Sequence, residues 1–537
     1  MARRLTLSNF SALLLGLLLA VGAQAGLGAP SALAAGRRPH VVISPGIHKI
    51  KHIIIIEQEN RSFDNYFGTF PGADGIAMRN GVPTMCAPNT TGGCQRPYHD
   101  TADVNGGGPH SEHASLMDAN GGKLNGFLIQ AIRGRHTCGY GVIDNPECSN
   151  SMTPDVMGYH TAAEIPNYWT YAKDFVLQDH MFEPVRSWSL PSHLYLVSGW
   201  SALCSSSNPG SCKNDIGGPY SPQLMKQYVD QALTSGTASI SNAWTDITWL
   251  LYRHKVPWAY YVQTGNQPDC ANSAAVTCAP VAQNYRTPGI WNPLPTFTDV
   301  QKDGQIHNVQ PLANYFKAAA SGTLPSVMWI APSQADSEHP PASVHQGQAY
   351  VTALINAAMK SPDWSSTAIF LQWDDWGGFY DSVMPPRVDQ NGYGLRVPGL
   401  VISPYARTGY VDHQTLSSDA YLKFIEDDFL GGARLNPATD GRWDPRPTVR
   451  ENVSVLGNLV NDFNFTQPPR APVLLPTNPP TDSPTIPAWF KGRGPCVGCT
   501  ITPPSVGSKR VIVPLRRPRA GVPRTAVPLR SPLPHRP

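Results

Sequence analysis

Charged residues are scarce in this sequence, and they are unevenly placed. Asp, Glu, Lys and Arg make up 15% of the 537 residues, and the formal net charge is +3. Residues 505–537 contain eight Lys and Arg residues and no acid, so the rest of the chain carries −5. Such a chain offers no basic surface for nucleic acid outside its last segment, and we expect no nucleic-acid partner.

Long hydrophobic runs are absent after the N-terminus, so no transmembrane span is predicted for the mature chain. The one apolar run, FSALLLGLLLAVGAQA at residues 10–25, follows Arg3 and Arg4 and ends in small residues. This pattern is typical of a signal peptide. We therefore predict a signal peptide at residues 1–35 and a secreted protein, either extracellular or associated with the cell envelope.

The sequence lacks a second CxxC motif, which disfavours a metal site built from cysteines. Its ten cysteines fall instead into close pairs. The pairs are Cys86/Cys94, Cys138/Cys148, Cys204/Cys212, Cys270/Cys278 and Cys496/Cys499. Close pairs in an exported chain favour local disulfides, which we predict for the first four pairs.

Strands and helices are predicted to alternate along the middle of the chain. Strands are predicted at residues 49–57, 324–332, 366–375 and 397–404. Helices are predicted at residues 347–362 and 417–430, and helix–strand pairs at 162–182 and 241–262. Residues 70–160 are rich in Gly, Pro, Asn and Cys and predict loops and short helices. This alternation is typical of an α/β sandwich with a mostly parallel central sheet.

The composition changes near residue 466, where proline becomes frequent. Proline cannot donate to a sheet or sit inside a helix, so residues 466–537 predict a Pro/Arg-rich, largely disordered tail after one domain at 40–465. The basic residues of this tail suggest contact with anionic polymers of the cell envelope. An extension without function is the alternative.

Polar residues stand at the carboxyl ends of two of the predicted strands. Glu59 and Asn60 come just after the isoleucine strand KIKHIIIIE, and Asp374 and Asp375 end the strand STAIFLQWDD. In open parallel sheets, ligands bind outside the carboxyl ends of the strands. Two adjacent carboxylates repel each other unless a cation neutralises them, so these residues favour a divalent cation site. Solvated acidic turns are the alternative.

The sequence lacks the GxSxG elbow, so a serine nucleophile would need another means of activation. Three serines in the stretch EPVRSWSLPSH are candidates, and the residues alone do not choose among Ser187, Ser189 and Ser192. A serine can attack where a metal stabilises its alkoxide. Histidines stand in loops or after predicted strands, where an imidazole can hold phosphate or protonate a leaving group. These histidines are His110, His113, His339 and His413.

Six blocks of the sequence resemble, in order, a family of bacterial phosphoesterases that holds the haemolytic and non-haemolytic phospholipases C and a related secreted acid phosphatase. The first three blocks are IIIIEQENRSFDNYFGTFPGADG, PHSEH with NGGKLNGF, and MFEPVRSWSLPSHLYLVSG. The others are SEHPP, AIFLQWDDWGGFYDSVMPP and RVPGLVISPYARTGYVDH. They cover about residues 48–435. The resemblance implies an alkaline phosphatase-like, three-layer α/β/α sandwich with a metal-assisted Ser or Thr nucleophile, which makes residues 40–465 a phosphoesterase catalytic domain.

The resemblance also implies a metal site. Carried over residue by residue, Glu59 and Asn60 would bind the ion, and Asn60 would also touch phosphate. Asp374 and Asp375 would complete the site, with Ser189 beside the ion. Oxygen ligands favour Ca²⁺, Mg²⁺ or Mn²⁺, and Zn²⁺ stays open.

The nucleophile and the phosphate ligands follow from the same resemblance. The family's nucleophile stands two residues before a proline, which is Pro191 here, so Ser189 is selected. His110, His339 and His413 would hold phosphate oxygens or the leaving group. The implied activity is hydrolysis of phosphate esters, either phosphomonoesters or phospholipid-type diesters, through a phosphoseryl intermediate.

The sequence departs from the family in three places. It has SWSLP where Gly-Pro usually precedes the serine, it lacks a further histidine after His413, and it lacks the C-terminal extensions of the larger phospholipases. The alternative function is a non-catalytic, envelope-binding protein with a structural cation. A sulfatase is disfavoured because SLPSH lacks the arginine of a C/S-x-P-x-R motif.

Several aromatic residues near these blocks allow two interpretations. They would form either a lipid-facing rim or part of the core, and for Trp373 the core is favoured. The residues are Trp188, Trp200, Trp373, Trp376 and Tyr380.

Overall fold

An eight-stranded sheet forms the centre of the structure, a computed structural model that describes residues 44–90, 92–133, 155–217, 242–269 and 280–481. These residues belong to one unit that begins at Ile43. The predicted signal peptide and basic tail lie outside the described residues, as do the cysteine pairs Cys138/Cys148, Cys270/Cys278 and Cys496/Cys499.

The strand order of the sheet is β14-β11-β15-β1-β16-β17-β8-β18. In that order the strands are Val309–Pro311, Trp258–Val262, Val327–Ala331, His52–Gln58, Thr367–Trp373, Gly399–Ile402, Val176–Gln178 and Tyr410–Asp412. Every neighbouring pair is parallel except those of β17, which runs antiparallel to β16 and β8. The sheet is therefore mostly parallel, as the sequence predicts.

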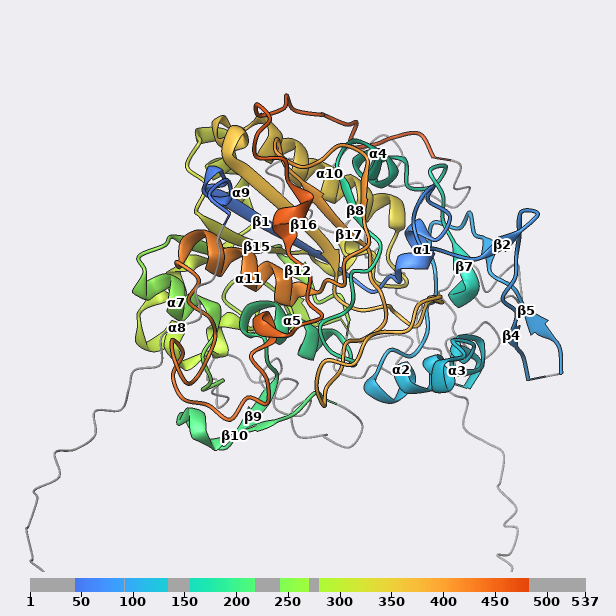
Figure 1. Ribbon diagram of the computed structural model, residues 1–537, viewed down its shortest axis with the longest axis horizontal. Coiled ribbons are helices and arrows are strands. Elements are labelled where there is room, and N and C mark those ends of the chain that lie inside the picture. Colours follow the sequence, from blue (N-terminus) through green and yellow to red (C-terminus); the bar gives the residue numbers. More distant parts are fainter. Residues whose placement is uncertain (1–43, 91, 134–154, 218–241, 270–279, 482–537) are drawn as a thin grey trace, which may run out of the picture. The chain divides into compact units, whose positions relative to one another are not determined.

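Helices cover both faces of this sheet (Figure 1). The helices α4, α9 and α10 pack together on one face, and α5, α7, α8 and α11 pack on the other. The bounds of these helices are Pro166–Asp174, Ala313–Ser321, Val344–Lys360, Ser189–Ser198, Ile247–Arg253, Thr298–Lys302 and Ser418–Phe429. This arrangement is the three-layer α/β/α sandwich expected from the sequence.

Shorter elements surround the sandwich. The remaining helices are α1 at Phe63–Phe67, α2 at Glu112–Ala119 and α3 at Phe127–Arg133. Strands of two or three residues also pair with each other outside the central sheet. Three pairs lie before residue 160: β2 with β3 (Met78–Arg79 and Val82–Pro83), β4 with β5 (Ala87–Pro88 and Cys94–Gln95) and β6 with β7 (Tyr98–His99 and Gly158–Tyr159). Two pairs follow later: β9 with β10 (Ala202–Cys204 and Cys212–Asn214) and β12 with β13 (Gly265–Asn266 and Ala282–Gln283). The described part of residues 70–160 therefore consists of loops and short elements, as predicted.

Strand β1 lies in the middle of the sheet and is buried on both faces. Its four isoleucines, Ile53 to Ile56, have no exposed surface. A continuous run of β-branched residues is what a strand covered on both faces requires. The register pairs Glu57 with Gln372 and Gln58 with Trp373. Strands β1 and β16 thus end at the same level, and the residues that follow them emerge side by side.

The structure confirms the predicted strands and helices and adds elements that the sequence did not predict. Strands β14 and β18 have three residues each, too few to give a periodic pattern. Helix α5 begins at Ser189, within a stretch for which the sequence gave no helix prediction. Strand β17 was predicted as a strand, but the sequence did not indicate its antiparallel direction.

Two disulfides join Cys86 to Cys94 and Cys204 to Cys212, which confirms two of the predicted pairs. The five aromatic residues for which a lipid-facing rim was considered are at most 5% exposed. They belong to the interior, so the rim interpretation is wrong for them.

The start of the proline-rich segment lies against the sandwich. Leu475 N donates to Asn356 Oδ1 at 3.2 Å, and Asn167 Nδ2 donates to Pro476 O at 2.8 Å. Residues 466–481 therefore pack against α10 and α4, beyond the predicted domain boundary at residue 465.

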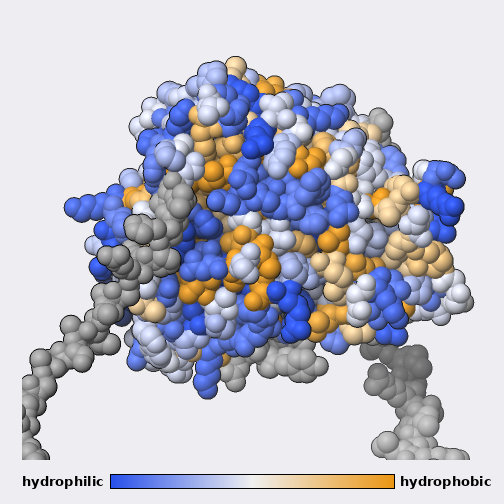
Figure 2. All heavy atoms as spheres, in the orientation of Figure 1, coloured by the Kyte–Doolittle hydropathy of each residue, from blue (hydrophilic) through white to orange (hydrophobic). Residues whose placement is uncertain are grey.

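The surface carries polar and apolar side chains together. On the face seen in Figure 2, hydrophobic side chains lie in several groups between hydrophilic ones. Among the described helices, none combines the length and the apolar composition needed to cross a membrane.

Candidate active site

The carboxyl ends of β1 and β16 hold the first part of the site. The backbone N–H of Asn60 donates to Asp374 Oδ1 at 3.0 Å, and Asp374 N donates to Gln58 O at 3.0 Å. Asn60 has a φ of +56°, a left-handed conformation that asparagine tolerates better than most residues. This conformation turns the chain away from β1 at the residue whose backbone N–H donates to Asp374.

Helix α5 brings Ser189 to the same place. Ser189 is the first residue of this helix, and its Oγ donates to Asp375 Oδ2 at 3.1 Å. Ser192 Oγ donates to the backbone oxygen of Asp374 at 2.7 Å, so the helix start is held against β16. Ser187 points elsewhere, because its hydroxyl donates to Ile216 O. The contacts single out Ser189 as the serine that faces the aspartates.

Two ring N–H groups hold Glu59 in position. Its Oε1 lies 3.3 Å from His193 Nε2 and also accepts a hydrogen bond from Trp291 Nε1. His193 Nε2 lies 3.7 Å from Asp374 Oδ2 as well. The second oxygen of Glu59 and Oδ2 of Asp374 are buried and make no hydrogen bond with any described residue. Both carboxylates therefore have a free oxygen in the interior.

Burial and mutual repulsion set the pKa values of these acids. Burial, followed by the charge of Asp374, raises the pKa of Glu59 well above its usual value. Burial and the same neighbour also raise the pKa of Asp375, while His110 and the Ser189 hydroxyl lower it. Burial, followed by the charge of Asp375, raises the pKa of Glu183. Several buried carboxyl groups thus lie in one region, and the positive charge around them is too small to balance their negative charges.

Two of the predicted histidines form a second cluster with an unpredicted aspartate. His110 Nε2 and His339 Nε2 each lie 3.3 Å from Asp269 Oδ2. Burial lowers the pKa of His110, but the charges of Asp375 and Asp269 outweigh it and raise this pKa to about 10. The His110 ring lies 6.5 Å from the ring of Trp376, which follows Asp375, so the histidine cluster adjoins the end of β16.

A buried carboxylate, Glu338, connects the segments that carry the site. Glu338 accepts hydrogen bonds from Tyr66 at 2.7 Å, Tyr168 at 2.5 Å and Trp373 at 3.0 Å. Its backbone oxygen accepts from Arg61 at 2.8 Å. Arg61 follows Asn60, Glu338 precedes His339, and Trp373 precedes Asp374. One residue, through its side chain and its backbone oxygen, therefore fixes the mutual positions of three site segments.

Gly377 and Gly378 allow the chain to pass close to the site. Both have positive φ, +60° and +74°. A Cβ on Gly377 would lie 2.4 Å from Asn60 O, and one on Gly378 would lie 2.4 Å from Gly108 Cα. Only glycine fits such an approach without moving backbone.

The structure brings together seven of the eight residues predicted for the site. Glu59, Asn60, Ser189, Asp374 and Asp375 form one group, and His110 and His339 adjoin it. His413 is the exception and corrects the expectation. Its Nδ1 pairs with Asp179 at 2.8 Å, and its side chain is 61% exposed.

The sheet order explains the position of His413. This residue follows β18, and β17 and β8 separate β18 from β16. Neighbouring strands lie about 4.8 Å apart, so β18 is roughly 14 Å from β16. A strand-end histidine at that distance cannot share the site.

Sequence reasoning missed His193, Asp269 and Trp291. His193 stands four residues after Ser189 on α5, and this spacing places two residues on the same helix face. The spacing was a usable signal for His193. Asp269 and Trp291 lie in loops without a repeating pattern, so nothing in the sequence marked them.

The residues at the ends of β1 and β16 suit a divalent cation. Within the part of the chain that the structure describes, neither the oxygen nor the nitrogen of the Asn60 side chain makes a hydrogen bond, although both are buried. Together with the free oxygens of Glu59 and Asp374, they leave unsatisfied polar atoms that a hard cation would bind. His193, Glu59 and Asp374 also meet the spacing of a metal-binding group.

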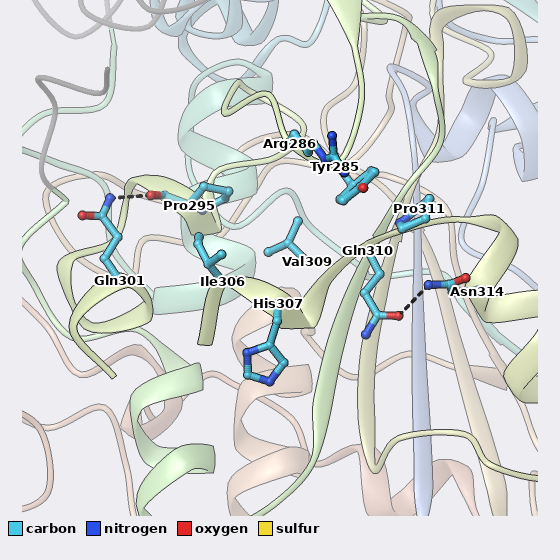
Figure 3. A pocket seen from close by; sticks show the side chains of 10 residues that line it. All are labelled: Tyr285, Arg286, Pro295, Gln301, Ile306, His307, Val309, Gln310, Pro311 and Asn314. Atoms are coloured by element: carbon cyan, nitrogen blue, oxygen red, sulfur yellow. Dashed lines mark hydrogen bonds between the residues drawn. The ribbon is translucent and has the colours of Figure 1, made fainter. Parts of the chain in front are cut away.

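A cavity of about 960 Å³ lies beside β14, the strand at one edge of the sheet (Figure 3). Val309, Gln310 and Pro311 of that strand line it, together with Arg286 and with His307 of the 3₁₀ helix Gln305–Asn308. None of the predicted site residues lines this cavity. The candidate site therefore rests on the strand ends.

Comparison with known proteins supports the family suggested by the sequence. The chain is 27% identical to "Non-hemolytic phospholipase C" of Burkholderia pseudomallei over 79% of this chain and 60% of that protein. It is 24% identical to "Phospholipase C B" of Mycobacterium tuberculosis over 82% of both chains. The chain thus spans 60% of the length of the first of these relatives, which is less than two thirds.

Likeness to solved structures is weak. A protein in the alkaline phosphatase superfamily from Vibrio parahaemolyticus is 11% identical, with a TM-score of 0.28 over 66% of this chain and 71% of that one. A TM-score this low supports no argument, so the fold class rests on the sheet and its two helix layers.

A profile of the Phosphoesterase family matches residues 50–430, which include both strand ends, α5 and the histidine cluster. The chain therefore belongs to the Phosphoesterase family.

Proposed function

We propose that this protein is a metal-dependent hydrolase of phosphate esters, acting on phosphomonoesters or phospholipid-type diesters through a serine nucleophile. The observation that carries the proposal is the contact between Ser189 Oγ and Asp375 Oδ2 beside the cluster of buried, partly unsatisfied acids. Family membership and the phospholipases C among its relatives support the same activity.

The residues that would hold the cation are those at the strand ends. They are Glu59, Asn60, Asp374, Asp375 and Ser189. Such a cation lowers the pKa of a coordinated hydroxyl and neutralises phosphate charge. The free buried oxygens of Glu59 and Asp374 fit an ion that prefers oxygen ligands, such as Ca²⁺, Mg²⁺ or Mn²⁺, and Zn²⁺ stays open.

In this proposal, Ser189 is the nucleophile that attacks phosphorus. Its hydroxyl already donates to Asp375, so this carboxylate stands where the proton goes when the oxygen attacks. Ser189 is also the first residue of α5, where the helix dipole favours negative charge. The Ser–O–P bond forms as the bond to the leaving alcohol breaks, and water then hydrolyses the phosphoseryl group.

The side chains around the phosphate position have defined roles in this proposal. The free amide of Asn60 would donate to a phosphate oxygen. His110 and His339 would stabilise the remaining oxygens or give a proton to the leaving alcohol. His193 and Trp291 would orient Glu59 through its Oε1.

The test is release of the aryl alcohol from phosphate esters by the purified mature protein with its disulfides intact. Three substrates separate the ester classes: an aryl phosphate monoester, an aryl phosphocholine diester and a bis-aryl diester, each with and without chelator. Ser189→Ala should abolish turnover, whereas Ser187→Ala should keep it, because the Ser187 hydroxyl faces Ile216 O. If no ester turned over in a folded, metal-supplemented protein, a non-catalytic envelope-binding role would replace the proposal.

We also propose that the protein is exported and that its basic tail contacts anionic polymers of the envelope. The support is the pattern of residues 10–25 and the eight basic residues in 505–537. Deleting residues 505–537 should lower the cell-associated fraction of the protein. An unchanged fraction would refute the contact.

A further inference from the structure

Two segments outside the sandwich expose large hydrophobic side chains. Met78 and Val82, in the β2–β3 hairpin, are 38% and 51% exposed, and Met384, in the loop after β16, is 43% exposed. A single exposed hydrophobic residue needs no explanation, because soluble proteins have many. Several of them in adjoining segments indicate a surface that binds something.

The hairpin and the loop are tied together at their bases. Ser382 Oγ donates to Gly75 O at 3.4 Å. Arg396 donates to the same Ser382 Oγ at 3.2 Å and, with its other amino group, to the backbone oxygen of the residue before Gly75. Met78 stands three residues after Gly75, and Met384 stands two residues after Ser382. The two methionines therefore extend from adjoining points of the surface.

The β2–β3 hairpin presents an apolar and a cationic side chain together. Its two strands are joined by Asn80 and Gly81, with φ values of +53° and +74°, as in the two-residue turns that favour Asn-Gly. Arg79 pairs directly with Val82, so their side chains lie on the same face, about 5 Å apart at Cβ. A Cβ added to Gly81 would meet nothing within 4 Å, so the turn projects from the fold.

The charge of this region is positive and uncompensated. Residues 75–99 contain Arg79 and Arg96 and no acid. Arg96 donates to the last backbone oxygen of β3 at 2.6 Å, which holds its guanidinium beside the hairpin. Neither arginine forms an ion pair within the described ranges, and the preceding acid, Asp74, pairs with His180 at 3.0 Å. Both positive charges are therefore available to an anionic partner.

The hairpin leaves the fold close to the proposed site. Ile76, just before β2, packs in the same hydrophobic cluster as Trp376 and Tyr380. The Trp376 ring in turn lies 6.5 Å from the ring of His110. In Figure 1, β2, β4 and β5 lie on the side of the sheet where α1 follows β1, which is the side of the strand ends. A surface that binds the hairpin would therefore face the same side of the molecule as the site.

We propose that this hairpin patch docks the protein on the surface of an anionic phospholipid bilayer. The hairpin patch consists of Met78, Arg79, Val82, Arg96 and Met384. A bilayer interface takes apolar side chains among its acyl chains and offers anionic headgroups to the arginines beside them. A soluble polyanion would bind the arginines alone and leave the exposed apolar side chains in water, so a lipid surface fits the patch better.

The inference rests on the phospholipid form of the proposed function, since it assigns the surface on which such a substrate lies. The relatives named phospholipase C support that form. Docking by the hairpin patch differs from the aromatic rim considered earlier, whose residues are buried. It also differs from the basic tail, because it needs apolar side chains as well as charge.

The test is sedimentation of the full mature chain with vesicles of phosphatidylcholine, made with and without phosphatidylglycerol. Every protein carries Ser189→Ala, so that the vesicles are not consumed. Val82→Asp should weaken binding to the anionic vesicles about tenfold, because the apolar side chain no longer enters the interface. Arg79→Gln should weaken binding about fivefold, and only when phosphatidylglycerol is present.

Val455→Asp is the matched control. Val455 is 41% exposed but lies outside the hairpin patch, so this variant should bind vesicles as its parent does. The basic tail is present in every variant, so its contribution to binding cancels in each comparison. Circular dichroism checks that each variant is folded, and Val82→Ser replaces Val82→Asp if the latter is not.

The outcomes separate this inference from the proposed function. No vesicle binding by the parent, or equal binding of Val82→Asp and the parent, would overturn the docking surface. A change only in oligomeric state would also overturn it, because the hairpin patch would then join two copies of the chain. Binding that depends on Val82 without turnover of any ester by the chain with Ser189 would support the patch while the proposed function fails.

Discussion

Replacing Gly377 by alanine tests whether the turn after β16 fixes the site. Gly377 has a φ of +60°, and an added Cβ would lie 2.4 Å from Asn60 O and 2.9 Å from Asn60 Cβ. The left-handed conformation costs an alanine about 1–2 kcal/mol. The backbone shift that relieves the close contacts adds about 1–3 kcal/mol. We expect Gly377→Ala to lower the free energy of unfolding by about 2–5 kcal/mol.

The matched control is Gly431→Ala. Gly431 has nearly the same φ, +61°, but an added Cβ meets nothing within 4 Å. Here only the cost of the left-handed conformation applies, and alanine also restricts the unfolded chain. Gly431→Ala should therefore lower the free energy of unfolding by about 1 kcal/mol. The difference between the two variants isolates the contact with Asn60.

Both variants are compared with the wild type by urea unfolding, by metal binding and by turnover of a phosphate ester. Displacing Asn60 also displaces Asp374, which its N–H holds at 3.0 Å. Gly377→Ala should therefore weaken metal binding by about 10–100-fold, in the range seen when support for metal ligands is removed. Gly431→Ala should keep both metal affinity and turnover. Equal stability and equal metal affinity in the two variants would refute this reasoning.

Three further predictions concern other parts of the molecule. Burial and the Arg61 charge lower the pKa of His160 from 6.5 to about 3, so its contribution to stability is complete above pH 6.5 and is lost as the pH falls through that window. Between pH 6.5 and 4.5 the wild type should lose about 2 kcal/mol more than His160→Gln in urea unfolding, and parallel curves would contradict this. Replacing Cys204 and Cys212 by serine removes a disulfide that closes a loop with a sequence separation of 8. The double variant should lose about 2–3 kcal/mol of the free energy of unfolding and show a lower Tm, and an unchanged Tm would contradict this. His413→Ala should leave phosphate release unchanged, and a loss beyond about tenfold would return His413 to the site.

The acidic part of the site was predictable from the sequence. Glu59, Asn60, Asp374 and Asp375 each follow a strand, and parallel strands deliver such residues to one edge. The register of β1 with β16 then places them in contact. The contact also requires β1 and β16 to be neighbours in the sheet, and the strand order of the structure supplies this.

The remaining positions depend on tertiary structure. Ser189 was selected by resemblance alone, because nothing local shows that α5 begins against β16. His413 was misplaced because strand order is not written in any single segment. Asp269 comes from a loop that carries no pattern, and only the three-dimensional structure shows that two histidines meet there.

The carboxylate of Glu338 has a consequence for folding. The bond from Arg61 to Glu338 spans 277 residues of sequence, and the bond from Tyr66 spans 272. Contacts between residues this far apart in sequence require the intervening chain to close into a loop, which costs conformational entropy. The catalytic pieces are therefore aligned only once the sheet from β1 to β16 is complete. If the proposed function holds, a chain that has not yet added Trp373 has no assembled place for an ion, so metal capture would report that β1 and β16 have come together.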